Sequence, residues 1–144
     1  VLKDEGINIW IRPEIGGKVF FFFFLNELLK ISQELDNVLP CFDFSHLFAR
    51  SIGKINTTNK FRQVFNDIEN SLGKRCLNNM HIHMSGITYN QKGERKHIPL
   101  SESEFNYQKL LNIWNDFNIK GVVISESPII EKDALTLQNY WKSL

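Results

Sequence analysis

The chain has 144 residues, of which 42% are hydrophobic, so it can bury a core and is too apolar to be disordered. Its 17 Lys and Arg residues nearly balance its 16 Asp and Glu residues, which argues against nucleic-acid binding by bulk charge but allows a local basic patch. Two cysteines without a CxxC pair build no disulfide framework. The longest apolar run, Val19 to Leu25, is too short to span a membrane, and we expect one intracellular, cytoplasmic domain over residues 1–144.

Strand-like and helix-like patterns alternate along the chain. Strands are expected at 7–11, 38–44, 76–84 and 121–125, the first of them buried. Apolar stripes predict helices over 25–35, 61–72, 107–117 and 134–144. Four β–α units in succession predict an α/β fold with a parallel sheet, about half of a (β/α)8 TIM barrel of typically ~250 residues. The alternative is a small open doubly wound sheet, and no GxGxxG or Walker A pattern supports nucleotide binding.

Five consecutive phenylalanines, Phe20 to Phe24, fit neither a helical stripe nor the alternation of a strand. We interpret this run as a buried connector. A loop altered by a homopolymer slip in the gene and a functional Phe box are the alternatives. An exposed run of this kind would be an aggregation hazard.

Ionisable residues stand at the ends of all four predicted strands, the edge at which parallel α/β folds form their sites. These residues, with the histidine of the loop over 86–100, are Glu14, Asp43, His46, His81, His83, His97 and Glu126. Carboxylates with imidazoles and no thiolates suit Zn, Mn or Fe, and the mixture is common in multi-metal hydrolases. The joint pattern therefore predicts a metal or acid/base site.

Each of these residues also has a purely structural interpretation. Glu126 could belong to an ordinary turn, and one of the two histidines of the third strand could be satisfied in the core. Asp43 and His46 have the spacing of a helix cap and a first-turn residue, and Glu14 could be a solvated loop residue. The cations Lys92, Arg95 and Lys96 in the loop over 86–100 could contact phosphate or simply be solvated.

Five segments together resemble a known family: RPEIGGK, LPCFDFSHLFAR, MHIHMSG, GERKHIPL and VVISESP. They are similar to the C-terminal half of the endonuclease IV family, above all its archaeal-type branch. These are zinc-dependent abasic-site endonucleases within the xylose-isomerase-like (β/α)8 barrels. The resemblance covers 6–144 and implies hydrolysis, in base excision repair, of the phosphodiester 5′ of an abasic site in DNA, with up to three zinc ions.

The resemblance also assigns ligands residue by residue. It implies that Glu14 bridges two zinc ions and that Asp43, His81 and Glu126 complete the ligands of the second. Glu14 and Glu126 would be the catalytic carboxylates. His83 would lie behind the ligands.

For the third zinc, the resemblance implies His46 and His97 as ligands. The family places an aspartate two residues before the second of these histidines. Here that position is Arg95, with Glu94 adjacent, so a third zinc requires a shifted ligand.

Three functions follow as hypotheses. The first is a metal-dependent phosphodiesterase acting on abasic DNA, in which a metal-activated hydroxide attacks phosphorus. The second is a sugar isomerase or epimerase of the same superfamily, with one divalent ion and with Glu14 and Glu126 as its acid/base pair. The third is a non-catalytic half-barrel remnant. The histidines and the basic loop favour the first hypothesis over the second.

The resemblance also implies partners beyond damaged DNA. The family's first-zinc histidines belong to its N-terminal half, which the matched segments do not include. A half barrel exposes strand edges at both ends. We therefore expect a fragment that pairs with the missing N-terminal half of the barrel or with a second copy of itself.

Overall fold

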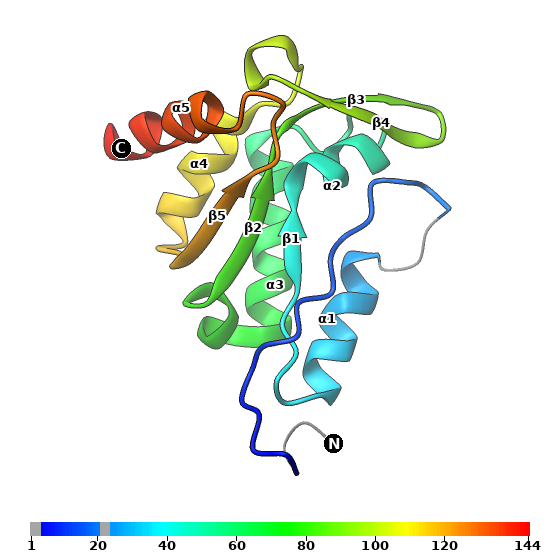
Figure 1. Cartoon of the computed structure of the whole chain (residues 1–144), viewed down its shortest axis with the longest axis vertical. Helices are drawn as coiled ribbons and strands as arrows, with labels where there is room; N and C mark the ends of the chain where they lie inside the picture. Colours follow the sequence, from blue (N-terminus) through cyan, green and yellow to red (C-terminus); the bar gives the residue numbers. More distant parts are fainter. Residues whose placement is uncertain (1–3, 21–23) are drawn as a thin grey trace.

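A three-stranded parallel sheet forms the centre of the computed structural model, which describes residues 4–20 and 24–144 (Figure 1). Its strands lie in the order β1 (Cys41–Asp43), β2 (Met80–Met84) and β5 (Gly121–Ser125). The segment from Ile11 to Glu14 extends the sheet beside β1 through two isolated parallel bridges, one at each end. Pro13 lies between the bridges, and because it has no amide hydrogen it cannot donate to a continuous ladder there.

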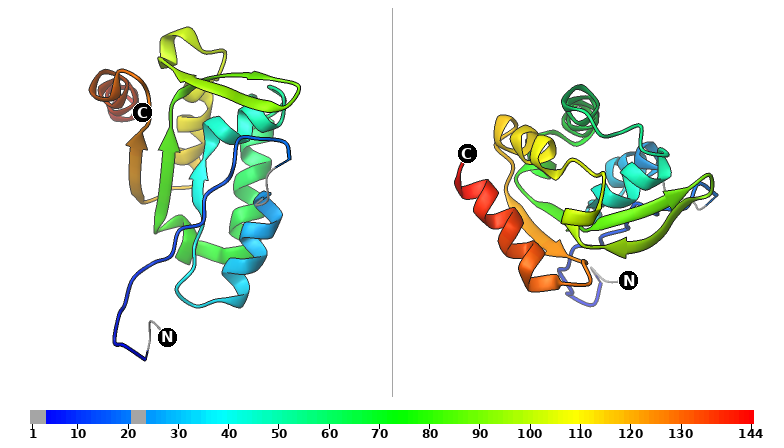
Figure 2. Two further views of the ribbon diagram at one scale, coloured as in Figure 1. Left: turned by 45° about the vertical axis from the view of Figure 1, so that its right-hand side comes forward. Right: turned by 90° about the horizontal axis from the view of Figure 1, so that it is seen from above.

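β1 and β5 lead directly into helices, and β2 leads to α4 through residues 86–106. Helices α1, α3, α4 and α5 form an arc around one side of the sheet (Figure 2). The helices are α1 (Leu25–Glu34), α2 (Phe44–Arg50), α3 (Thr58–Leu77), α4 (Tyr107–Asp116) and α5 (Ile130–Lys142), with a 3-10 turn η1 (Leu100–Glu102). None of the helices in the described part of the chain is long and apolar enough to cross a membrane.

The core lies between the sheet and this arc of helices. Phe42 of β1 and Ile82 of β2 are fully buried on the helix-facing side. Helix α3 presents Phe61 and Phe65 to the core at helical spacing, and the ring of Phe65 stacks on Phe44 with centroids 5.5 Å apart. Burial of these aromatic rings contributes strongly to the stability of the fold.

The expected α/β architecture is confirmed. The predicted strands over 76–84 and 121–125 correspond to β2 and β5, the strand over 38–44 is shortened to β1, and all four predicted helices are present. Helix α2 is not among the four predicted helices, but it begins as the cap interpretation of Asp43 and His46 suggested, with Asp43 as its N-cap. Within the described residues the parallel sheet is open rather than closed into a barrel, as expected for half of a (β/α)8 fold.

The prediction of a buried strand over 7–11 is wrong. This segment forms one bridge, at Ile11, and its apolar side chains are exposed. The reason is its position at the edge of the sheet, where its one bridge joins Ile11 to Val38 ahead of β1 and no element of the described chain covers its other side.

The buried-connector interpretation of the phenylalanine run is also wrong where the structure describes it. Phe20 is 77% exposed, and Phe24 is exposed with the guanidinium of Arg50 stacked 3.7 Å above its ring. Residues 21–23 lie outside the described residues.

The predicted loop over 86–100 is instead an antiparallel hairpin of β3 (Gly86–Asn90) and β4 (Gly93–Ile98). Its turn is stabilised by the Asn90 side chain, whose Oδ1 accepts a hydrogen bond from the Lys92 amide, and by Gly93 at φ 92°. The hairpin projects beyond the carboxyl ends of the central strands (Figure 1).

Two phenylalanine substitutions test the location of the core. We expect Phe65→Ala to lower the free energy of unfolding by about 3–5 kcal/mol, because it leaves a cavity among stacked rings. The same substitution at exposed Phe20 should change it by less than about 0.5 kcal/mol. Urea denaturation followed by circular dichroism measures both, and equal effects would contradict the assignment of the core.

Candidate metal centre

Strand register brings polar residues of β1 and β2 to one face of the sheet. Asp43 is the direct neighbour of His83, and Cys41 is the direct neighbour of His81. Since side chains alternate along a strand, these four residues share the face opposite to buried Phe42. They form two layers, with Asp43 and His83 nearer the carboxyl ends of the strands.

Four side chains meet at that end of the sheet, and we call them the carboxylate cluster: Glu14, Asp43, His83 and Glu126. The Nδ1 atom of His83 lies 3.1 Å from Oε1 of Glu14 and 3.0 Å from Oε1 of Glu126. One donor atom from each of the four residues falls within 4.8 Å of the others. Three carboxylates and one imidazole at this spacing are a suitable ligand set for Zn²⁺ or Mn²⁺.

Asp43 is the buried member of the carboxylate cluster, with a fully inaccessible side chain. Its Oδ1 accepts a 2.6 Å hydrogen bond from the amide of His46 and so caps α2. Its Oδ2 accepts no hydrogen bond from the described residues. The pKa of Asp43 is raised to about 7, mainly by burial and also by the carboxylates of Glu14 and Glu126, against the lowering effect of the amide hydrogen bond. A buried carboxylate oxygen without a hydrogen-bond donor fits a cation ligand.

His46 connects the carboxylate cluster to a second group of side chains. Its Nδ1 lies 3.4 Å from Oδ2 of Asp43 and 3.5 Å from Oε1 of Glu14. Its Nε2 faces the other way, 3.3 Å from Oε2 of Glu94 and 3.4 Å from Nε2 of His97. We call His46, Glu94 and His97 the histidine cluster.

The hairpin supplies Glu94 through a β-bulge. Thr88 pairs with Lys96, and the next residue along β3 pairs with Glu94, so Arg95 is an extra residue in β4. The bulge places Glu94 on the same face as His97, although the two are three residues apart. A side chain at Gly17 would overlap the Glu94 carboxylate, with its Cβ 1.9 Å from Oε2, so this glycine leaves the space that Glu94 occupies.

The carboxylate and histidine clusters contain five of the six residues predicted as metal ligands: Glu14, Asp43, His46, His97 and Glu126. The sixth, His81, lies apart from the carboxylates, one layer back beside Cys41. His83, expected behind the ligands, is the strand histidine in contact with the carboxylates.

Sequence reasoning missed Cys41, and it named Glu94 only as the neighbour of Arg95 at the position of the family's third-zinc aspartate. The bulge that turns Glu94 toward His46 has no signal in the pattern of a short polar strand. Cys41 could have been found, because it lies two residues before Asp43 and so belongs to the same face of β1. Burial raises the pKa of the Cys41 thiol to about 12, with Glu14 and Asp43 adding to the effect.

The basic side chains Lys92, Arg95 and Lys96 are all exposed along the hairpin. The turn carries Lys92, and the bulge directs Arg95 into solvent. Such side chains are free to contact an anionic partner or to stay hydrated.

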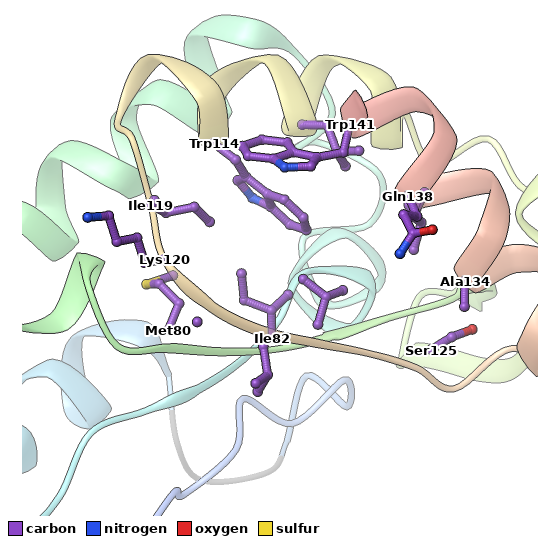
Figure 3. A pocket seen from close by; sticks show the side chains of 14 residues that line it. Met80, Ile82, Trp114, Ile119, Lys120, Ser125, Ala134, Gln138 and Trp141 are labelled. Atoms are coloured by element: carbon purple, nitrogen blue, oxygen red, sulfur yellow. The ribbon is translucent and has the colours of Figure 1, made fainter. Parts of the chain in front are cut away.

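A separate pocket of about 380 Å³ lies on the helix side of the sheet, between β2, β5, α4 and α5 (Figure 3). Trp114 and Trp141 form one wall, and Ala134 and Gln138 of α5 form another. Its lining includes no carboxylate, imidazole or thiol, and Lys120 is its one ionisable residue, so the pocket lacks the ligand groups of a metal site.

The raised pKa of Asp43 predicts how stability depends on pH. Because the folded pKa of about 7 exceeds the reference value of 3.8, the folded state binds more protons between these values. The free energy of unfolding of the metal-free chain should fall as pH rises through this range, by up to about 1.4 kcal/mol per pH unit. Asp43→Asn should flatten this slope, and exposed Asp67→Asn is the matched control. Urea titrations across the range measure the slope, and an unchanged slope in Asp43→Asn would contradict the assignment.

Comparisons with known proteins agree with this architecture. A family model described as a xylose isomerase-like TIM barrel matches residues 1–144. The uncharacterized protein MJ0133 of Methanocaldococcus jannaschii is 48% identical over 143 residues, which cover 99% of this chain and 52% of the relative. A solved structure described as "The crystal structure of AsfvAP:AG" shares the fold at a TM-score of 0.64 and 13% identity, over 96% of this chain and 54% of that one. The chain spans about half the length of both and belongs to the family of xylose isomerase-like TIM barrels.

Proposed function

We propose that the chain supplies part of the centre of a metal-dependent phosphodiesterase that cleaves DNA at abasic sites. The observation that carries this proposal is the position of His46 between two ligand clusters. Its Nδ1 faces Asp43 while its Nε2 faces Glu94. Donor atoms for more than one cation are therefore adjacent, as phosphodiester hydrolysis by multi-metal enzymes requires.

The residues divide between two cation positions. The carboxylate cluster would hold one cation, and the histidine cluster would hold another. Cations bound there would supply Lewis-acid activation of water and stabilise negative charge on phosphate oxygens. Zn²⁺ suits both clusters, and Mn²⁺ or Fe²⁺ also suits the carboxylate-rich one.

The chain's own side chains would orient the metal ligands and bind the phosphates of the substrate. Glu14 and Glu126 are partly exposed, at 38% and 32% of their side chains, and His83 between them fixes both carboxylates at hydrogen-bond distance. The exposed cations Lys92, Arg95 and Lys96 extend along the hairpin beside this centre and suit contacts with backbone phosphates of a duplex. The near-neutral net charge then agrees with a partner that binds one local surface.

A sugar isomerase or epimerase is the second candidate. The convergence of Glu14 and Glu126 on one nitrogen of His83 favours it, because such an enzyme needs one divalent cation and an acid/base pair. It requires no histidine cluster. Substitution of Glu94 and His97 therefore separates the two candidates.

The proposed hydrolysis can be tested in a chimera in which residues 1–144 replace the matching region of the M. jannaschii relative. With Zn²⁺ or Mn²⁺ we expect cleavage of a duplex that carries one abasic-site analogue, resolved by denaturing electrophoresis. Glu126→Gln and His97→Gln should each lower kcat at least ~100-fold, since each removes a cation ligand. Gln91→Ala in the hairpin turn is the control.

Two results would contradict the phosphodiesterase proposal. One is a folded, metal-loaded chimera that leaves abasic DNA intact. The other is interconversion of ketose and aldose that survives His97→Gln, which would support the isomerase instead. Loss of both activities with retained metal binding would favour the non-catalytic remnant.

We propose further that the open edges of the sheet pair with the rest of a barrel. At one edge Val122, Val123 and Ile124 of β5 are exposed, and at the other the segment over 7–11 is exposed. Unpaired apolar edges of this kind recruit another strand. Because this chain matches 52% of the relative and 54% of the solved structure, the missing portion is of nearly equal size, as the second half of an eight-stranded barrel is.

The pairing proposal predicts that the unmatched portion of the M. jannaschii relative binds this chain. Val123→Lys should weaken that binding at least ~10-fold, because it places a charge on the edge of β5. Leu135→Lys changes another exposed apolar side chain, on α5, and should leave binding unchanged. Isothermal calorimetry measures the affinity. Concentration-dependent self-association of this chain, lost in Val123→Lys, would assign the edge to a second copy instead.

A further inference from the structure

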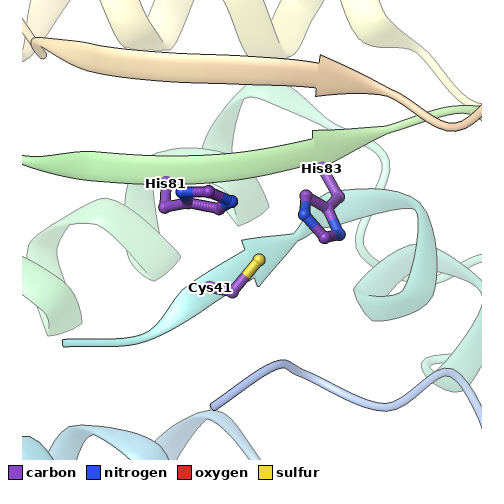
Figure 4. Close-up of side chains that lie close together, drawn as sticks. All are labelled: Cys41, His81 and His83. Carbon is purple, nitrogen blue, oxygen red and sulfur yellow. The ribbon is translucent and has the colours of Figure 1, made fainter. Parts of the chain in front are cut away.

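A second ligand group lies one layer behind the carboxylate cluster. It consists of Cys41 from β1 and of His81 and His83 from β2, with one donor atom of each within 4.8 Å of the others. Figure 4 shows the sulfur of Cys41 and the two imidazole rings directed toward a common space on the face of the sheet opposite to the helices.

The register of the parallel strands fixes this group. Cys41 and His81 are direct cross-strand neighbours, and His83 follows His81 on the same face of β2. The two imidazole rings lie with centroids 5.3 Å apart. The positions of the three donors therefore come from backbone pairing and do not depend on flexible loops.

We propose that Cys41, His81 and His83 form a second metal subsite, selective for a thiophilic divalent cation of the zinc class. One thiolate and two imidazoles are a known ligand type for zinc, with a fourth position left to water or substrate. The oxygen-rich carboxylate cluster suits harder cations such as Mn²⁺ equally well, whereas a sulfur ligand disfavours them. On binding, a zinc–sulfur bond forms and the thiol proton passes to solvent.

The surroundings of the subsite suit a cation. His81 and His83 are half-buried, so a cation reaches buried Cys41 past the two rings. The carboxylates of Glu14, Asp43 and Glu126 lie in the adjacent layer and supply negative charge. The guanidinium of Arg12, whose positive charge also acts on Cys41 and His81, donates hydrogen bonds to Asn79 at 2.8 and 2.9 Å.

His83 belongs to both ligand groups, which has a consequence for occupancy. A neutral imidazole has one nitrogen with a free lone pair. A cation held by Cys41 and His81 therefore competes with a cation in the carboxylate cluster for the same ring. The inference is that a thiophilic metal at the new subsite lowers the affinity of the carboxylate cluster for Mn²⁺.

Cobalt titration tests the subsite directly, since a thiolate ligand gives Co²⁺ an intense near-ultraviolet charge-transfer band. We expect this band in the wild-type chain and its loss in Cys41→Ser. His81→Gln should weaken Co²⁺ binding at least ~10-fold. Cys76→Ser is the matched control, because Cys76 is equally buried but lies in α3, and it should retain the band.

A second measurement separates loss of the subsite from loss of the fold. Mn²⁺ binding followed by electron paramagnetic resonance should persist in Cys41→Ser, and added Zn²⁺ should weaken it in the wild type more than in this variant. Absence of the band in a wild-type chain that binds Co²⁺, or its persistence in Cys41→Ser, would overturn the proposal. Glu126→Gln should abolish the proposed hydrolysis yet keep the band, so the two proposals fail independently.

Discussion

The in-register pairing of β1 with β2 is the constraint on which the candidate centre depends. Pairing Asp43 with His83 also pairs Cys41 with His81, because side chains repeat every second residue along each strand. A shift of either strand by one residue would turn its two polar side chains into the phenylalanine-rich core and expose Phe42 of β1 or Ile82 of β2. Burial of those two apolar side chains therefore stabilises the polar face as well as the core.

The rest of the centre is added from elements outside the sheet. Helix α2 begins at the point where Asp43 caps it, and this fixes His46 three residues later beside the carboxylate cluster. The hairpin extends over the same edge of the sheet, and its strand β4 places Glu94 and His97 in contact with His46. Arg50 of α2 donates a hydrogen bond to the carbonyl of Gly16 and so secures the loop that follows Glu14. One short helix thus aligns the two clusters.

Sequence patterns predict the parts of this molecule that follow strict periodicity. The predictions of helix α3 and of the MHIHM strand are confirmed, because the burial of their side chains repeats with a fixed period. The segment over 7–11 fails because its pattern shows β propensity but not whether a neighbouring strand covers it. Which of His81 and His83 contacts the carboxylates depends on the register of β2 and on how far along the strand each lies. The spacing of residues within β2 reveals neither. Glu94 depends on a bulge, a tertiary feature of the hairpin.

The charge distribution explains why this edge suits cations rather than a structural salt-bridge network. Three carboxylates approach one another around His83, with Asp43 fully buried and one of its oxygens without a hydrogen-bond donor among the described residues. Mutual repulsion and desolvation both disfavour this arrangement, and the raised pKa of Asp43 expresses that cost. Packing in the core holds the strands in register despite the repulsion. A divalent cation bound by the proposed ligands would offset both the repulsion and the desolvation, so crowding these groups would favour its binding.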